Sequence, residues 1–342
     1  MLKKVLEVMH RGFISLWVGF ALLFGVVGDA LARCQGDEVP LRFAVQDQAT
    51  HPVVPRLARL TASTINVELQ GKACLTLVED AQKFDGLLVV NALTGNEVDI
   101  ALIELSRLTT LQAGYGVFQL PFVFRDYRVA QKFSSSIAVR ALGEGLAQSG
   151  LVTKGIVHGG FSQLTGKTAL MSPIDLLGLR FRPSRFDKTG LGPALRAVPQ
   201  NLLEADLSEA IKDGRVEAQS NDWTAIRSGD HGKLHDGVTV SNHAYHGYAL
   251  VLSKRWWDAQ TPQLQKDIEG TFARVVQQTN FETGRRISAA RRLVMQTGVP
   301  VRLLTRGQLR AWRAAVEPVW QAFDAPEQAA LMQALSAANA GP

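Results

Sequence analysis

Two histidines stand four residues apart in this chain of 342 residues, at His231 and His235. On a helix, that spacing aims two imidazoles at one metal ion. Gly232 and its turn-like surroundings argue against a helix, and neither an intervening glutamate nor a third ligand is evident. We therefore expect no metal centre. The sequence also lacks a Ser-His-Asp order, a nucleophile elbow and a phosphate loop, so we expect neither a cofactor nor an enzyme.

Arg182 offers a different chemistry, because it ends the strand-like run Leu179–Arg182. A guanidinium donates two parallel hydrogen bonds to one carboxylate, and a strand end holds it rigidly. A carboxylate closed away from water needs such a partner, since desolvating an unpaired anion costs several kcal/mol. The residue type alone leaves two interpretations open, an anion-binding residue and a surface arginine beside a turn.

The N-terminus has the pattern of a signal peptide. Three basic residues precede an uncharged run from Gly12 to Gly28, and Ala30–Ala32 is a small-x-small cleavage site. This run is shorter than the about 18 apolar residues that a membrane-spanning helix needs. We expect residues 1–32 to be a signal peptide that is cleaved near Ala32, with export to the periplasm. A membrane anchor is the alternative.

The charge balance favours anions as ligands. The chain has 37 basic and 31 acidic side chains, a formal charge of +6. A nucleic-acid binder would need this excess on one face, and an exported protein rarely meets nucleic acid, so we expect no such partner. The densest basic run has helical spacing and is a solvated face or, less favoured, a docking surface for an anionic partner. It comprises Arg285, Arg286, Arg291 and Arg292.

The two cysteines, Cys34 and Cys74, both follow the cleavage site, in a compartment where disulfides persist. One bridge is the obvious pairing. Cys34 precedes the apolar run Leu41–Val45 and Cys74 opens the run Leu75–Val78. If these runs form neighbouring parallel strands, both cysteines lie near one end of the sheet. Two free thiols are the alternative.

Strand-like runs alternate with segments of helical spacing, which predicts βαβ units and a parallel sheet. A mature chain of about 310 residues exceeds one usual core, so we expect two lobes. We predict a helix over Tyr127–Gln148, a strand over Thr153–Val157 that leaves the first lobe, and a return to it at Tyr248–Leu252. The other predicted strands are Leu41–Val45, Leu75–Val78, Val98–Ile103, Leu179–Arg182 and Val216–Gln219.

From Thr261 onward the pattern is helical. Thr261 is a good N-cap and Pro262 suits the first turn, so we predict a helix that ends near Thr297. At about 1.5 Å per residue, such a helix spans both lobes. Thr305 and Gln308 form a capping-box pattern, and the remainder of the chain to Ala338 is helical by spacing.

Four motifs resemble, in order and in spacing, those of the DctP type of solute-binding subunit from tripartite ATP-independent periplasmic (TRAP) transporters. They are Val98–Ile100 with Leu120–Phe124, Asp175–Arg182, Ala210–Asn221 and Ser241–His243. Each motif alone is weak, but four in register are specific. The resemblance covers essentially the whole mature chain.

This resemblance implies an α/β, two-lobed periplasmic-binding-protein-like fold (type II-like), with hinge strands and a long helix spanning both lobes. The first lobe is then expected to hold residues 33–159 and 248–286, and the second residues 160–247 and 287–342. The apolar run Tyr248–Leu252 independently suggests the return to the first lobe.

The resemblance also assigns site residues. Arg182 matches the arginine that grips the substrate carboxylate, and Asn221 matches an asparagine that contacts the same group; a turn asparagine is the alternative. Glu104 and Arg107 lie in a segment that resembles one from members binding acidic sugars, where the glutamate accepts from ligand hydroxyls. A simple ion pair between them is the alternative.

One departure from the family pattern concerns a second arginine. Ser162 stands where many members carry it, so a second cationic clamp is missing there. Arg185, three residues after Arg182, is a hypothetical replacement if its side chain turns inward. Glu204 falls near a position where relatives offer an aromatic platform.

These observations predict an extracytoplasmic protein that binds a small organic carboxylate between its lobes and delivers it to TRAP permease subunits in the membrane. We expect a monomer, although composition says nothing about oligomeric state. Within the same class, the alternative partner is an ABC importer or a sensor protein. The alternative of another class is a secreted α/β hydrolase or lyase.

Overall fold

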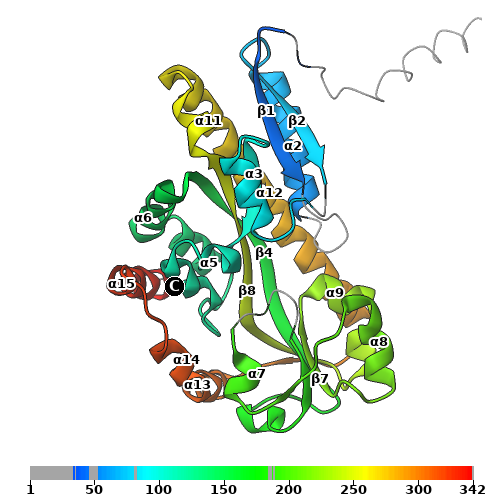
Figure 1. The fold of residues 1–342 in the computed structure, drawn as a ribbon. Coiled ribbons are helices and arrows are strands. Elements are labelled where there is room, and N and C mark those ends of the chain that lie inside the picture. Colours follow the sequence, from blue (N-terminus) through cyan, green and yellow to red (C-terminus); the bar gives the residue numbers. More distant parts are fainter. Residues whose placement is uncertain are drawn as a thin grey trace, which may run out of the picture.

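One mixed sheet carries the whole fold in a computed structural model, which describes residues 34, 36–45, 53–80, 83–183, 187 and 189–340. The strand order is β2-β1-β3-β8-β4-β7-β5-β6, and β9 pairs with β8. Figure 1 shows two lobes joined by β4 and β8. The strands are β1 (Val39–Val45), β2 (Ala73–Glu79), β3 (Ile100–Glu104), β4 (Leu151–Gly166), β5 (Arg180–Arg182), β6 (Val198–Pro199), β7 (Ala218–Asn221), β8 (Val238–Ser253) and β9 (Val301–Leu303).

Helices surround this sheet. Those of the first part of the chain are α2 (Val53–Glu68), α3 (Leu88–Thr94), α4 (Leu105–Leu108), α5 (Tyr127–Ser134) and α6 (Ile137–Gly145), with the 3-10 helices η1 (Ala113–Gln119) and η2 (Leu146–Ser149). Then follow η3 (Pro173–Leu176), α7 (Leu191–Ala194), α8 (Glu204–Lys212), α9 (Trp223–Ser228), α10 (His231–Leu234), α11 (Lys254–Asp258), α12 (Pro262–Gln296), α13 (Arg306–Ala315), α14 (Glu317–Gln321) and α15 (Gln328–Asn339).

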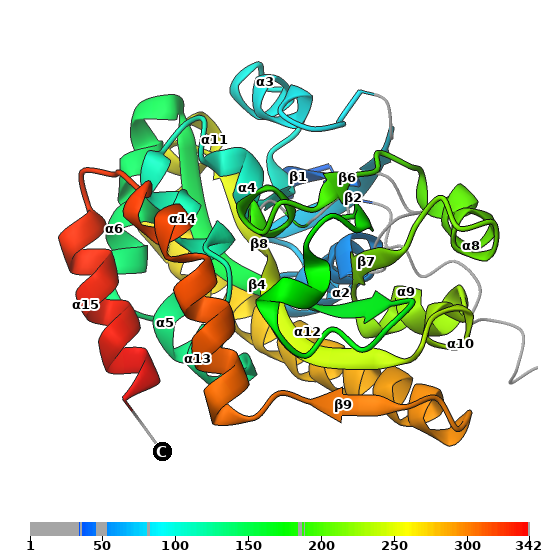
Figure 2. The same ribbon diagram turned by 90° about the horizontal axis from the view of Figure 1, so that it is seen from below.

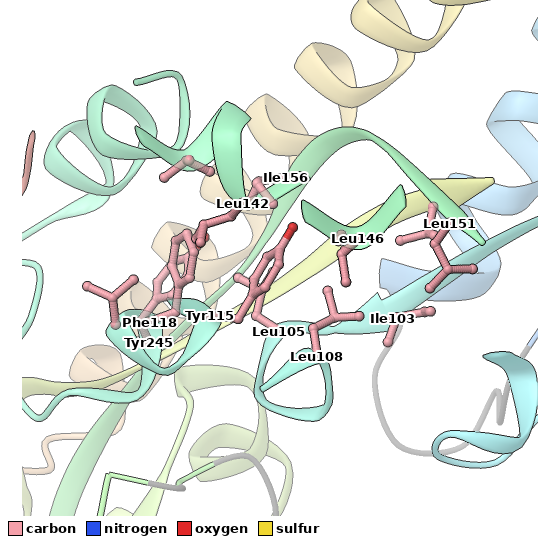
Figure 3. Packing of buried hydrophobic residues seen from close by; sticks show 14 of the residues in the cluster. Ile103, Leu105, Leu108, Tyr115, Phe118, Leu142, Leu146, Leu151, Ile156 and Tyr245 are labelled. Atoms are coloured by element: carbon pink, nitrogen blue, oxygen red, sulfur yellow. The ribbon is translucent and has the colours of Figure 1, made fainter. Parts of the chain in front are cut away.

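The first lobe is built on β1, β2 and β3, which run parallel, with β8 antiparallel to β3. The central strand β3 is apolar from Ile100 to Ile103 because both of its faces are buried. In β3, Ile100 and Leu102 face a core shared with α2 and α12, whereas Ala101 and Ile103 face a second core. Figure 3 shows this second core, where η1, α6 and η2 pack on the sheet. The predicted return of Tyr248–Leu252 to this lobe is confirmed.

Two strands of 16 residues each, β4 and β8, cross between the lobes. Their first-lobe halves pair with each other beside β3, and the far half of β4 pairs with β7 of the second lobe. The pairing of β4 with β8 is irregular at three places, Thr153/Gly155, His158/Gly160 and Ser162/Leu164. Irregular pairing of this kind tends to bend a strand pair, so we expect the crossing to bend at these places.

Helix α12 contacts both lobes, and it begins and ends where the sequence predicts. Thr261 is the N-cap, with its side chain accepting from the Leu264 amide, and Thr297 is the C-cap. At about 1.5 Å per residue, its 35 residues measure about 52 Å. Phe272 lies in the first lobe's core and Val294 packs in a cluster with Trp223 of α9. Figure 1 shows α12 running from the first lobe, beside α2, to the second lobe, beside α9.

The predicted single helix over Tyr127–Gln148 is wrong. The segment forms α5 and α6, which are separated at Ser135 and Ser136. Ser135 ends α5, and the Ser136 side chain accepts from the Val139 amide at the start of α6. Serine side chains compete for backbone groups, so adjacent serines favour a cap over a continuous helix.

The C-terminal helices contact both lobes. Trp312 of α13 packs with Phe181 of β5, in the second lobe. Leu331 and Leu335 of α15 instead lie in the first lobe's core. In Figures 1 and 2, α13, α14 and α15 follow one flank of the molecule, opposite α8.

The predicted bridge between Cys34 and Cys74 is confirmed, with the two Cα atoms 5.3 Å apart. Its physical basis is the parallel pairing of β1 and β2, which sets Pro40 beside Cys74. The predicted signal peptide lies outside the described residues. Among the helices that the structure describes, none is both long and apolar enough to cross a membrane.

Candidate ligand-binding site

The carboxyl ends of β5 and β7 form the centre of the candidate site. These strands are parallel, with Arg182 beside Gln219, and Asn221 follows two residues later on the same face. Ligands in open α/β sheets bind outside the carboxyl ends of parallel strands. The sequence predictions of Arg182 and Asn221 therefore fall at one edge of the second lobe.

Arg182 is a buried cation, with 4% of its side chain exposed. Its Nε and Nη2 atoms donate to the Leu202 carbonyl, both at 3.3 Å. Its Nη1 lies 2.9 Å from Oε2 of Glu204. This contact is an ion pair without hydrogen-bond alignment, because Nη1 has no hydrogen-bond acceptor among the described residues. A buried guanidinium with a spare donor is equipped to hold an anion.

Asn221 brings a second, uncharged donor to the same carboxylate. Its Nδ2 donates to Oε1 of Glu204 at 2.7 Å, and its Oδ1 accepts from the Asp222 amide. Asp222, rather than Asn221, caps the following helix α9 by accepting from the Thr224 amide at 2.6 Å. The Nδ2 group of Asn221 is therefore directed at a carboxylate, whereas its Oδ1 bonds to the start of the turn.

A row of neutral polar side chains continues this face onto β4. Gln219 donates to Oγ1 of Thr165 at 2.8 Å, and Thr165 contacts Nδ1 of His235 at 2.7 Å. Burial lowers the pKa of His235 to about 4, so this imidazole is neutral near pH 7. Oε1 of Gln219 is buried and receives no hydrogen bond within the described part of the chain. The row adds hydrogen-bonding capacity next to Arg182 without adding charge.

The sequence argument against a helix at Gly232 is wrong, because the short helix α10 (His231–Leu234) includes the first histidine of the pair with metal-like spacing. His231 begins this helix and His235 is its C-cap. Burial lowers the pKa of both imidazoles. In the described residues, no three His, Cys, Asp or Glu side chains gather as a metal site would require.

Ser162 lies in the crossing strand, completely buried, with its hydroxyl 2.9 Å from Nε2 of His246. In this conformation the hydroxyl is occupied by the imidazole. Arg185, the hypothetical replacement for a second clamp, lies outside the described residues.

Glu104 and Arg107 lie on the first lobe, where β3 ends. Ser106 donates to Oε1 of Glu104, and Nε of Arg107 is 3.7 Å from the other carboxylate oxygen. Arg107 also lies 3.6 Å from Asp85. The two side chains form a long ion pair, and 36% of the Arg107 side chain remains exposed. Both residues can therefore bind another group.

The two halves of the candidate site stand on opposite sides of the crossing. Glu104 is level with Tyr248 and Val157, whereas Asn221 is level with Gln163. The six residue-to-residue steps from Val157 to Gln163 correspond to about 20 Å of extended strand. The structure therefore brings Arg182 and Asn221 together but leaves Glu104 and Arg107 on the facing lobe.

Sequence reasoning missed the side chain that joins Arg182 to Asn221. Glu204 was noted only as a departure from an aromatic position, yet its carboxylate contacts both donors. Gln219 was also missed, although its place two residues before Asn221 in one strand was a usable signal.

A separate hollow of about 700 Å³ lies between α5, β4 and α12. Tyr127, His158 and Arg285 are among its lining residues. It contains none of the predicted site residues, and it flanks the crossing rather than the ends of the parallel strands. We therefore place the candidate site at Arg182.

Comparison with known proteins identifies the family. The family model for bacterial extracellular solute-binding proteins of family 7, named DctP, matches residues 43–326. The C4-dicarboxylate-binding periplasmic protein DctP of Vibrio cholerae is 28% identical over 317 residues, which cover 91% of this chain and 94% of that protein.

Solved structures show the same fold. A TRAP periplasmic solute-binding protein from Ochrobactrum anthropi, with its C-terminus bound in the ligand-binding pocket, has a TM-score of 0.80 at 22% identity, covering 88% of this chain and 94% of that one. One from Shewanella oneidensis with bound succinate has a TM-score of 0.73 at 23% identity, covering 88% and 99%. The two-lobed fold expected from the sequence is thus confirmed. The chain belongs to the DctP family, the bacterial extracellular solute-binding proteins of family 7.

Proposed function

We propose that this protein is the extracytoplasmic binding subunit of a TRAP transporter, which captures a small organic carboxylate between its lobes and delivers it to the membrane permease. The observation that carries the proposal is the donor pair of Arg182 and Asn221, which already holds a carboxylate, that of Glu204. The names of its relatives support the ligand class, since the Vibrio cholerae protein is named for C4-dicarboxylates.

The binding mechanism that we infer is lobe closure. A small organic acid is much shorter than the about 20 Å of strand that separates Glu104 from Asn221, so both can contact it only after the lobes approach. The acid first binds Arg182 and Asn221 on the second lobe. Glu104 then accepts from its hydroxyls and Arg107 supplies a further cation. The ligand thus stabilises the closed form through contacts that only this form offers.

The lobe boundaries follow from the same proposal. The division expected from the sequence gives residues 33–159 and 248–286 to the first lobe and residues 160–247 and 287–342 to the second, and we propose it with one change, at α15. The packing of Leu331 and Leu335 in the first lobe's core supports moving α15 to that lobe. Ser162 would reach a ligand only if its hydroxyl parts from Nε2 of His246, and Arg185 remains a hypothetical second cation for the ligand. The hinge is then the stretch of β4 and β8 at the irregular pairings.

The cellular setting follows from the family. We infer cleavage of the signal peptide near Ala32, a monomeric periplasmic protein, and permease subunits as the membrane partner. Its relatives are solute-binding proteins rather than enzymes, so we infer that the bound acid leaves unchanged.

A ligand screen with the purified mature chain tests the function. Succinate, L-malate, pyruvate, D-galacturonate and sialic acid are each added, and the melting temperature is measured. A tight ligand raises it because binding stabilises the folded state by mass action, by about 2.7 kcal/mol at a hundredfold excess over Kd. Isothermal titration of the best acid follows. Absence of any shift across the panel, or chemical conversion of the bound acid, contradicts the proposal.

A further inference from the structure

Glu204 occupies the position that the proposed function gives to the ligand. One of its oxygens lies 2.9 Å from Nη1 of Arg182, and the other accepts from Nδ2 of Asn221 at 2.7 Å. These are the two donors that would hold the carboxylate of the acid. We propose that Glu204 is a tethered competitor, which fills the anion site of the empty protein and must be displaced by the incoming carboxylate. This inference rests on the proposed function.

Displacement requires that Glu204 can leave while Arg182 stays in place, and the exposure of their side chains differs in this sense. The Glu204 side chain is 50% exposed, whereas that of Arg182 is 4% exposed. Glu204 is the first residue of α8, after the apolar N-cap Leu203. When its side chain turns outward, it returns to water and stays beside the start of α8, where negative charge is favoured. The buried guanidinium keeps its bonds to the Leu202 carbonyl.

The charges at the site argue for exchange rather than for joint binding. Arg182 and Glu204 together are neutral. An acid that entered while Glu204 stayed in place would set two carboxylates side by side in a partly buried site, where like charges repel strongly. Replacing one carboxylate by another leaves the site neutral. A ligand carboxylate that aligns with Nη1 of Arg182 gains a hydrogen bond that Glu204 does not make, because Nη1 has no hydrogen-bond acceptor among the described residues.

Exchange has a consequence for specificity. A ligand has to outcompete a carboxylate that is held at high effective concentration by its tether. An anion that binds only one of the two donors, Arg182 or Asn221, loses this competition. An acid that also gains contacts from the first lobe wins it. Glu204 therefore acts as a specificity-determining residue, because it raises the threshold for weak and monodentate anions.

The experiment compares wild type with Glu204→Ala and Glu204→Gln. The matched control is Asp206→Asn, because Asp206 is acidic, exposed and in the same first turn of α8. Association and dissociation rates for succinate, L-malate and D-galacturonate are measured by stopped-flow tryptophan fluorescence, and Kd by calorimetry. If Glu204 occupies the site for about two thirds to nine tenths of the time, its removal tightens Kd by about three- to tenfold.

The rate constants distinguish competition from direct contact. A competitor acts only on the empty protein, so the gain in affinity is expected in the association rate, with the dissociation rate within about twofold of wild type. Asp206→Asn is expected to leave both rates unchanged. Faster dissociation and weaker binding in Glu204→Ala would mean that Glu204 contacts the bound acid, and this overturns the inference.

Failure of the inference can be told apart from failure of the function. If wild type binds an acid and Glu204→Ala binds it with the same rates, the anion site stands but Glu204 does not compete for it. If neither wild type nor either Glu204 variant binds any of the three acids, the carboxylate-binding function fails and the inference fails with it.

Discussion

The carboxylate of Asp187 lies 3.0 Å from Nε2 of His243, and both side chains are almost fully buried. Asp187 follows Arg182 by five residues, whereas His243 belongs to the crossing strand β8. Burial raises the pKa of Asp187, but hydrogen bonds from His243, Thr189 and Ser220 outweigh it and hold the pKa well below its usual range. The contact anchors Asp187 to the crossing strand β8.

The first prediction concerns this anchor. Asp187→Ala leaves buried donors without their acceptor, so the free energy of unfolding at pH 7 falls by about 3 kcal/mol. Urea denaturation measures the change. The exposed Asp206→Ala is the reference and stays within about 0.5 kcal/mol of wild type. Equal midpoints for the two variants would show that the anchor adds no stability.

The arrangement around His243 differs from that of a hydrolytic triad. Ser241 contacts Nδ1 of His243, and both Asp187 and Ser220 contact Nε2. A triad instead places the carboxylate on Nδ1 and the nucleophile on Nε2. His243 is also fully buried and packs near the ring of Phe122, with 6.2 Å between ring centroids. The contacts of His243 therefore differ from those of a triad at both ring nitrogens.

The second prediction concerns the anion site. Arg182→Ala weakens binding of the best acid from the panel at least tenfold, by about 2–5 kcal/mol, because the bound carboxylate loses its charged partner. Arg182→Lys keeps the charge but loses the two-pronged geometry, so an intermediate loss is expected. Arg215→Ala removes an exposed arginine of the same lobe and serves as the control. An unchanged Kd for Arg182→Ala by calorimetry would discard this residue as the anchor.

The edge on which Arg182 and Asn221 lie could be predicted from the sequence, because strand ends follow from local pattern. The ends of α12 were equally readable, since Thr261 and Pro262 are strong local signals. The position of Glu204 could not be predicted. It depends on the path of the chain between β6 and α8, which no periodicity specifies.

Other features could not be predicted from the sequence because they depend on packing between residues far apart in the chain. The helical spacing of the α15 segment could be recognised in the sequence. Which lobe α15 covers could not, because it depends on contacts with residues about 200 positions earlier, such as those of Leu331 with the core around Phe118. The serine pair Ser135 and Ser136 was a local signal for a break, but the helical spacing around it led to the wrong prediction of one continuous helix.

The third prediction concerns pH. Burial lowers the pKa of His158 and of His235 to about 4. The unfolded chain takes up these protons near pH 6.5, so the stabilising contribution is present above that pH and is lost as the pH falls toward 4. Between pH 6.5 and 4.5 the free energy of unfolding falls by about 2 kcal/mol per histidine. Urea denaturation of His158→Gln and His235→Gln across this range should show a slope reduced by that amount, and parallel curves would contradict it.

The fourth prediction concerns the bridge from Cys34 to Cys74, which closes a loop with a sequence separation of 40. By the loop-entropy model, removing it lowers the free energy of unfolding by about 4 kcal/mol. The double variant Cys34→Ala/Cys74→Ala is compared with wild type, with and without reductant. Wild type should weaken in reductant and the double variant should not respond. A loss below about 1 kcal/mol would mean that the unfolded chain gains little freedom.

The fifth prediction concerns the crossing strand at Gly160. Its φ of +135° is favourable only for glycine, and an added Cβ would lie 2.9 Å from Cδ1 of Ile287 on α12. Gly160→Ala therefore carries both backbone strain and a steric clash, and the free energy of unfolding falls by about 2–4 kcal/mol. Gly178→Ala is the matched control, because its φ is +71° but its Cβ would meet nothing within 4 Å. It should lose only the backbone part, about 1 kcal/mol. If the two variants melt together, Ile287 yields freely and α12 does not restrain the crossing. If Gly160→Ala is less stable than Gly178→Ala, α12 and the crossing strand β4 are packed as one unit. The proposed lobe closure then has to bend them together.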